Sequence, residues 1–261
     1  MFETSLLRRS LSLSLSAVLA PSIVLTTTFD AVAEDDQPPP RFYIGVGGYM
    51  SSSPFIGADD ETGLIPYLAY EGDYITLDLS GLAVSPIKNE HLQISVVVRP
   101  RWILVEPEDS PALTGMDRDI GVDAGAALDL RHGPFSLSAE FLADITNENE
   151  GRELTLGAGY ATSVLARGRF GVDAGARWRN EELATYLYGV FEDEALAGRP
   201  AFAVEETWHP YAGVTLSYAF TPKLLATIRA EAEFLPDAVQ DSPIIDDDIA
   251  LTSFFGILYG F

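Results

Sequence analysis

The chain offers few side chains from which a catalytic site could be built. It has no cysteine and three histidines, His91, His132 and His209. A hydrolase needs a nucleophile, a base and a group that orients the base, but no serine here stands in a recognisable nucleophile context. His209 is the one plausible base, with Glu205 and Glu206 as possible orienting groups, although its place after a long connection favours a solvated histidine. The sequence therefore predicts no enzyme activity, no cofactor and no metal site.

Charged residues that alternate with apolar ones are the more informative chemical feature. In residues 119–131, for example, Asp123 and Asp129 alternate with Val122 and Leu128. Successive side chains of a strand face opposite sides of the sheet, so such charges share one face. Either they pair across neighbouring strands and fill an interior, or they line a small channel that prefers cations. The charges predicted to face the interior are Arg99, Arg101, Asp123, Asp129, Glu140, Asp173, Arg177, Arg179, Arg229, Glu231 and Glu233.

These charges lie on alternating segments of about ten residues, which is the length that crosses a bilayer as a tilted strand. Short turns at residues 88–90, 131–134, 166–169 and 221–223 alternate with long connections at 51–63, 106–118, 147–152, 180–208 and 236–248. Short periplasmic turns opposite long outer loops are typical of an antiparallel up-and-down β-barrel in the outer membrane. The loop from Glu181 to Trp208 is rich in aromatic residues, so we expect it to fold into the barrel mouth as a plug or lid.

The number of strands follows from parity, because both ends of such a barrel normally lie in the periplasm. Eight segments follow residue 92 and one spans residues 42–50, so residues 64–87 must hold an odd number of strands. Turn signals at 71–73 and 80–81 favour three. The sequence therefore predicts twelve strands, with ten as the alternative if residues 64–87 form one long bulged strand.

The N-terminus carries an export pattern. Arg8 and Arg9 precede an apolar stretch over residues 11–25, and small residues at 31–33 fit a cleavage site. We predict a cleaved signal peptide over residues 1–33, a short periplasmic lead-in over 34–41 and a single barrel domain over 42–261. No later run of about 20 apolar residues predicts a transmembrane helix.

The closing strand also indicates a barrel in the outer membrane. Residues 250–261 alternate strictly and end on an aromatic residue. Such an ending also suits the last strand of a soluble sandwich, but the export pattern and the loop lengths favour a barrel. The ending resembles the signal read by the bacterial barrel-assembly machinery, and the residues that carry this resemblance are Phe255, Ile257, Tyr259 and Phe261.

The formal net charge of -23 argues against nucleic acid as a partner. Acidic clusters at 59–61, 192–194 and 246–248 could bind calcium or magnesium, but none has the spacing of a dedicated calcium loop. We expect solvated outer loops, or cation bridges from these loops to lipopolysaccharide phosphates in the surrounding outer-membrane lipid.

Several motifs resemble the MipA/OmpV family of outer-membrane proteins. They are residues 57–60 and 65–70, Tyr188-Gly189-Val190, Gly198-Arg199-Pro200, the ending Tyr259-Gly260-Phe261 and above all Asp241, Ser242, Pro243 and Ile244. The resemblance implies a non-enzymatic barrel, whose best-described relative acts as a scaffold that brings a murein lytic transglycosylase near a murein synthase. Other members are associated with adhesion, osmolarity or antibiotic response. The family has no established catalytic residues, and this chain departs from it in its very acidic loops.

Overall fold

The computed structural model describes residues 41–102, 110–116 and 118–261. The predicted signal peptide and all of the lead-in except Arg41 lie outside these residues, so both remain predictions. No helix in the described part of the chain is long and apolar enough to cross a membrane.

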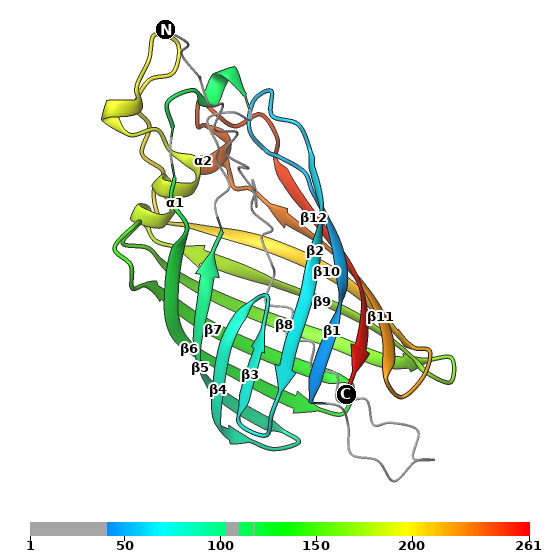
Figure 1. The fold of residues 1–261 in the computed structure, drawn as a ribbon. Coiled ribbons are helices and arrows are strands. Elements are labelled where there is room, and N and C mark those ends of the chain that lie inside the picture. The colour runs from blue at the N-terminus through cyan, green and yellow to red at the C-terminus, as the bar shows by residue number, and fades with distance from the viewer. Residues whose placement is uncertain (1–40, 103–109, 117) are drawn as a thin grey trace, which may run out of the picture.

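The described residues form one closed antiparallel barrel, in which each strand pairs with its neighbours in sequence and β12 closes against β1 (Figure 1). This confirms the prediction of twelve strands, and the ten-strand alternative is wrong. The strands are β1 Phe42–Ser51, β2 Glu61–Glu71, β3 Ile75–Asp78, β4 Gly81–Lys88, β5 Leu92–Arg101, β6 Gly121–His132, β7 Phe135–Asp144, β8 Arg152–Val164, β9 Gly168–Arg179, β10 Thr207–Ala219, β11 Leu224–Phe234 and β12 Ile249–Gly260.

Alternation places apolar side chains on the outside of the barrel. On β12, Leu251, Phe255, Ile257 and Tyr259 are exposed on the outer face, while Phe254 and Leu258 are buried inside. Tyr43 opposite Gly260 and Ser51 opposite Thr252 fix the register of the closing pair. Because both edges of β12 are paired, no strand edge is left at the closure. The reading of its aromatic residues as an insertion signal stays a prediction.

The region between β1 and β5 is built differently from the rest. β2 is long, but β3 and β4 form a short hairpin with a tight turn at Leu79 and Ser80. The pairing of β4 with β5 shifts between Val84 and Ile87, on either side of Pro86. Proline lacks a backbone N–H, so a bulge is a natural place for it in a sheet.

The two ends of the barrel differ in their connections: long connections lie at one end and short turns at the other. The short helices η1 Pro111–Leu113, α1 Glu181–Tyr188, η2 Glu192–Glu194 and α2 Asp237–Gln240 all belong to the long connections. In Figure 1 the labelled helices α1 and α2 lie at the end away from the C-terminus, which is at the end with the short turns. Long loops mark the outer end and short turns the periplasmic end.

Candidate functional site

The barrel contains a cavity of about 310 Å³, and many of the residues that line it are charged. All eleven charged residues that the sequence analysis assigned to the interior line it. They come from β5, β6, β7, β9 and β11, because alternation puts one charged face of each strand on the inside.

Most of the charges form one chain of ion pairs across the interior. Arg229 contacts Asp173 and Glu231 at 2.7 Å, and Arg177 contacts Glu231 at 2.6 Å and Glu233 at 2.5 Å. The chain continues from Glu233 through Arg179, Glu153 and Arg101 to Asp123. Buried charges are tolerated when each has partners of opposite sign. The charges along this side of the cavity are therefore paired with one another.

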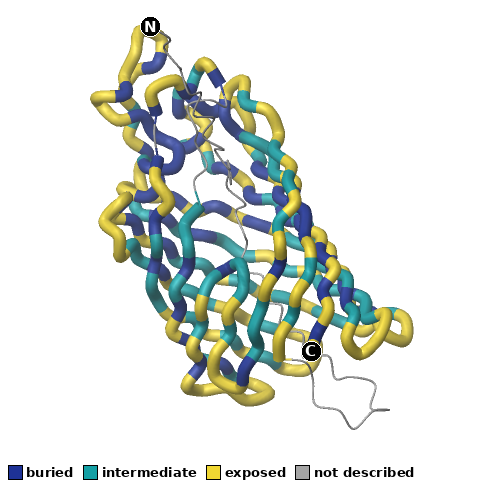
Figure 2. The backbone as a smooth tube through the Cα atoms, viewed as in Figure 1, coloured by how far each residue is buried: buried dark blue, intermediate teal, exposed yellow. Residues whose placement is uncertain are grey.

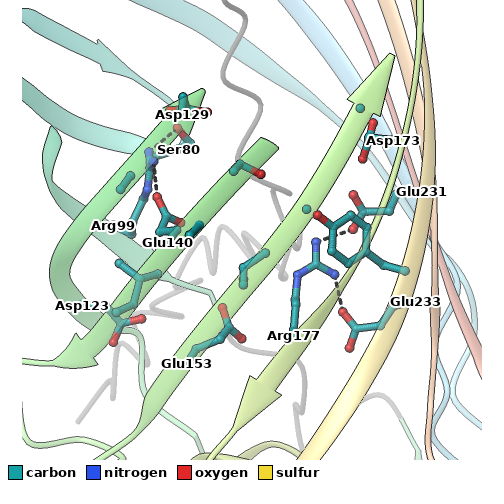
Figure 3. A pocket seen from close by; sticks show the side chains of 18 of the residues that line it. Ser80, Arg99, Asp123, Asp129, Glu140, Glu153, Asp173, Arg177, Glu231 and Glu233 are labelled. Atoms are coloured by element: carbon teal, nitrogen blue, oxygen red, sulfur yellow. Dashed lines mark hydrogen bonds and ion pairs between the residues drawn. The ribbon is translucent and has the colours of Figure 1, made fainter. Parts of the chain in front are cut away.

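A second group lies across the cavity from Arg177, Glu231 and Glu233 (Figure 3). Arg99 contacts Glu140 at 2.7 Å and donates to the hydroxyl of Ser80 at 2.9 Å. Asp129 lines the same side of the cavity. Arg99 therefore ties the tip of the β3–β4 hairpin to β7.

The cavity lining is close to electrically neutral, with six arginines and seven carboxylates. The net charge of -23 belongs elsewhere, chiefly to the outer connections with their runs Asp59-Asp60-Glu61 and Asp246-Asp247-Asp248. The expected cation preference was drawn from the charge of the whole chain, and the lining gives it no support.

Two buried residues of the interior, Glu153 and His209, were not among the eleven predicted ones, and neither was Arg131, which also lines the cavity. Glu153 lies between Arg101 and Arg179 in the chain of ion pairs. His209 was expected to be solvated, which is wrong, because its exposed fraction is 0%. Its Nδ1 is 3.1 Å from both Arg179 and Glu233, whereas the predicted orienting groups Glu205 and Glu206 are exposed. His209 is in phase with the inward-facing Tyr211, and this alternation was the signal available in the sequence.

The outer connections fold into a compact cap with its own apolar core. Leu113 and Met116, Leu183 and Leu187 of α1, and Ile244 after α2 are buried in one cluster. Figure 2 shows this burial as dark blue segments at the outer end. Leu187 also lines the cavity. The loop after β9 thus folds as a lid, as its aromatic composition predicts.

Two arginines hold the cap together. The guanidinium of Arg118 forms an ion pair with both carboxylate oxygens of Glu194, and it lies 4.6 Å from the centre of the Phe191 ring. Arg199 donates to the backbone carbonyls of Ala112, Thr114 and Glu194. Glu194 is therefore a buried structural group rather than a solvated member of an acidic cluster.

Tyr188 connects the cap with the charged interior. Its hydroxyl accepts from Arg179 at 3.1 Å, and its ring stacks on His209 with the centroids 5.6 Å apart. Burial raises the pKa of Tyr188, so the phenol stays neutral. Its backbone carbonyl accepts from the hydroxyl of Ser242 at 2.6 Å. Of the motif Asp241-Ser242-Pro243-Ile244, Ser242 and Ile244 are thus buried in the cap, while Asp241 is exposed.

The described residues contain no group of three histidine, aspartate or glutamate side chains placed to hold a metal ion. In the first acidic cluster Glu61 accepts from the hydroxyl of Tyr49 at 2.8 Å. In the third, Asp246, Asp247 and Asp248 are exposed.

These features define an outer-membrane β-barrel with an ion-paired interior and a folded outer cap. The family model described as "MltA-interacting protein MipA" matches residues 44–261, and the chain belongs to the MipA family. "Putative outer membrane protein YiaT" of Escherichia coli is 25% identical over 84% of this chain and 90% of that protein. "Outer membrane protein OmpV" of Vibrio cholerae is 25% identical over 77% of this chain and 79% of that protein. The protein therefore resides in the outer membrane.

A relative with a more specific name matches over a shorter stretch. "MltA-interacting protein" of Escherichia coli is 32% identical over 33% of this chain and 36% of that protein. Among solved structures, "Bacterial polysaccharide outer membrane secretin" covers 86% of this chain and all of its own, with 10% identity and a TM-score of 0.47. The COG4313 outer membrane channel of Pseudomonas putida F1 covers 88% of this chain and 99% of its own, with 10% identity and a TM-score of 0.44. The barrel assignment rests on this chain's own strand pairing.

Proposed function

We propose that this protein is a non-enzymatic, non-conducting barrel that serves as a scaffold, holding murein-remodelling enzymes at the periplasmic face of the outer membrane. The partner classes are a lytic transglycosylase and a murein synthase. The name of the MltA-interacting relative supports the first of these. The observation that carries the proposal is the ion-paired interior, where a chain of paired charges lies beneath a folded cap.

A scaffold needs a docking surface that faces its partners. The periplasmic turns carry exposed basic side chains that could form such a surface. The chain has two lysines, and both are exposed: Lys88 ends β4 beside the β4–β5 turn, and Lys223 lies in the β10–β11 turn. Arg167 is exposed in the β8–β9 turn and donates to the carbonyl of Phe220 in the β10–β11 turn, so the two hairpins lie together. A basic rim suits an acidic patch on a partner.

Charge reversal at this rim tests the scaffold. We expect Arg167→Glu combined with Lys223→Glu to lower crosslinking to a lytic transglycosylase in cell envelopes by at least tenfold. The matched control is Glu205→Lys combined with Glu206→Lys, which reverses two exposed charges before β10 at the outer end. The control should crosslink as the wild type does. If the wild-type barrel captures neither murein enzyme, the scaffold proposal fails.

The cavity favours a second candidate, a channel for small solutes. A lining with both signs of charge would accept zwitterionic or neutral solutes rather than select cations. Single-channel conductance in planar bilayers separates the two candidates. The scaffold proposal expects a closed trace from the wild type and from a variant without residues 181–206. A stable open conductance in the wild type would favour the channel.

A further inference from the structure

One stretch of the barrel wall lacks strand pairing within the described part of the chain. β2 pairs with β3 only at Tyr70 opposite Leu77 and Glu71 opposite Thr76. On the other side of the hairpin, the pairing of β4 with β5 ends at Leu82 opposite Val98. Figure 1 shows the short β3–β4 hairpin between the much longer β2 and β5. Toward the outer end, residues 61–69 of β2 pair only with β1, and residues 99–101 of β5 only with β6.

This unpaired edge lies at the depth of the lipid. On the outer face of β2, Leu64 is 74% exposed and Leu68 is 63% exposed, as expected for side chains that contact lipid tails. An unpaired backbone at this depth is tolerated only where it is covered by protein or lines a cavity. Pro66 of β2 and Pro100 of β5 lie on the two flanking edges, and proline has no backbone N–H to leave unpaired. The sequence is thus compatible with an edge here.

Behind the edge, the middle of the inner face of β2 is apolar, and Asp78 and Glu71 are the carboxylates close enough to Tyr67 to act on it electrostatically. The inward residues Ile65, Tyr67 and Ala69 of β2 join a cluster with Leu79 at the hairpin tip and Phe254 of β12. Elsewhere the inner faces of β5 to β11 carry the ion pairs. The apolar part of the interior is therefore the part that adjoins the missing pairing.

The cavity reaches the other margin of the same stretch. Its lining includes Ser80 at the hairpin tip and Pro100 and Trp102 at the end of β5. The bond from Arg99 to Ser80 holds the tip toward β5. As a result, the tip closes the lower part of the wall, and no strand of the described residues fills the part toward the outer end.

We propose that the wall between residues 61–69 and residues 99–101 is a lateral opening that admits an acyl chain of a membrane lipid to the apolar patch at Tyr67. Hydrocarbon lies outside the opening and apolar side chains lie inside it, so an acyl chain passes between two similar environments. A water-soluble solute would have to enter the lipid before it could reach this opening, so the opening suits an acyl chain better. This role concerns the side wall, and it is independent of the scaffold at the periplasmic rim.

Quenching by bromine tests the opening, because brominated lipid chains quench tryptophan at close range. The background carries phenylalanine at the three native tryptophans, Trp102, Trp178 and Trp208. The reporter is Tyr67→Trp, an inward ring beside the opening. The matched control is Tyr211→Trp, an inward ring of similar burial on β10, which is paired with β9 and β11 at that point. Both variants are reconstituted in vesicles of dibrominated or unbrominated phosphatidylcholine.

We expect the brominated chains to reduce the fluorescence of Tyr67→Trp at least twofold more than that of Tyr211→Trp. Phe255→Trp, on the lipid-facing side of β12, sets the full quenching. Equal quenching of the two inward reporters would overturn the proposal. If Tyr67→Trp does not give a heat-modifiable barrel, Leu79→Trp at the hairpin tip replaces it, with the same expected and opposing results.

Discussion

The same strands reach both ends of this barrel, but the segments that connect them differ between the two ends. At the outer end, the long connections meet in a cap with a buried core, where Leu113, Leu183 and Ile244 are fully buried. At the periplasmic end, the strands are joined by short turns whose residues are mostly exposed, such as Leu165 at 85% and Lys223 (Figure 2). Within the described residues, the outer end buries a core of side chains from distant segments, whereas contacts between distant residues at the periplasmic end, such as Arg167 with Phe220, are exposed.

The difference shows where substitutions should matter. A substitution in the cap, or at its junction with the interior, removes contacts that many segments share. A substitution in a periplasmic turn alters a solvated surface, which typically changes stability little. Matched substitutions at the two ends measure this contrast.

The largest effect is expected at the junction of cap and interior. Arg179 contacts Glu153, Glu233 and Tyr188 and is 1% exposed. Arg179→Met leaves two buried carboxylates with fewer partners, which should cost about 3–5 kcal/mol of unfolding free energy. Urea unfolding in detergent, followed by the gel shift between folded and unfolded barrel, measures it. The control is Arg167→Met at a periplasmic turn, and equal losses would contradict the contrast between the ends.

The next effect concerns the cap core. Ile244→Ala removes a fully buried side chain, and such truncations cost about 2–5 kcal/mol. We expect the cap to open locally while the barrel stays closed, because the strand ladder does not depend on Ile244. Limited proteolysis should cut the connection between β11 and β12 faster, and the gel shift of the barrel should remain. Leu165→Ala serves as the control, and unchanged proteolysis of Ile244→Ala would show that the cap is not a cooperative unit.

A smaller effect is expected at the start of the lid helix. The side chain of Asn180 accepts from the backbone N–H of Leu183 at 3.3 Å and so caps α1. Asn180→Ala should destabilise α1 by about 1 kcal/mol, whereas Asn180→Asp should retain the cap. Hydrogen exchange of the α1 amides measures this directly. Similar exchange in the two variants would mean that packing against the barrel, rather than capping, determines the helix.

The same contrast explains what the sequence could predict. The barrel was predictable because its signals are local: alternation within each strand, turn residues between strands and an even strand count. The inward position of the eleven charges follows from the same alternation. The cap was predictable only as a lid, since its contacts join distant positions such as Arg118 with Glu194 and Ser242 with Tyr188.

His209 and Glu194 illustrate the limit. Sequence neighbours suggested a solvated histidine and an acidic cluster, but the partners that bury these side chains lie on other strands and loops. The unpaired wall beside β2 was equally hidden, because three strands in residues 64–87 give the right count whatever their lengths. In the sequence, only Pro66 and Pro100, on the two strands that flank the short hairpin, indicate where pairing is missing.

The smallest change in stability is expected at the periplasmic rim, where the largest change in binding is proposed. Arg167→Glu combined with Lys223→Glu should alter the unfolding free energy by less than about 0.5 kcal/mol, because both side chains are exposed. The same urea titration measures it. A lost crosslink with unchanged stability would assign the effect to docking at the rim. A loss of several kcal/mol would instead mean that the periplasmic turns support the barrel as the cap does, and the contrast between the two ends would not hold.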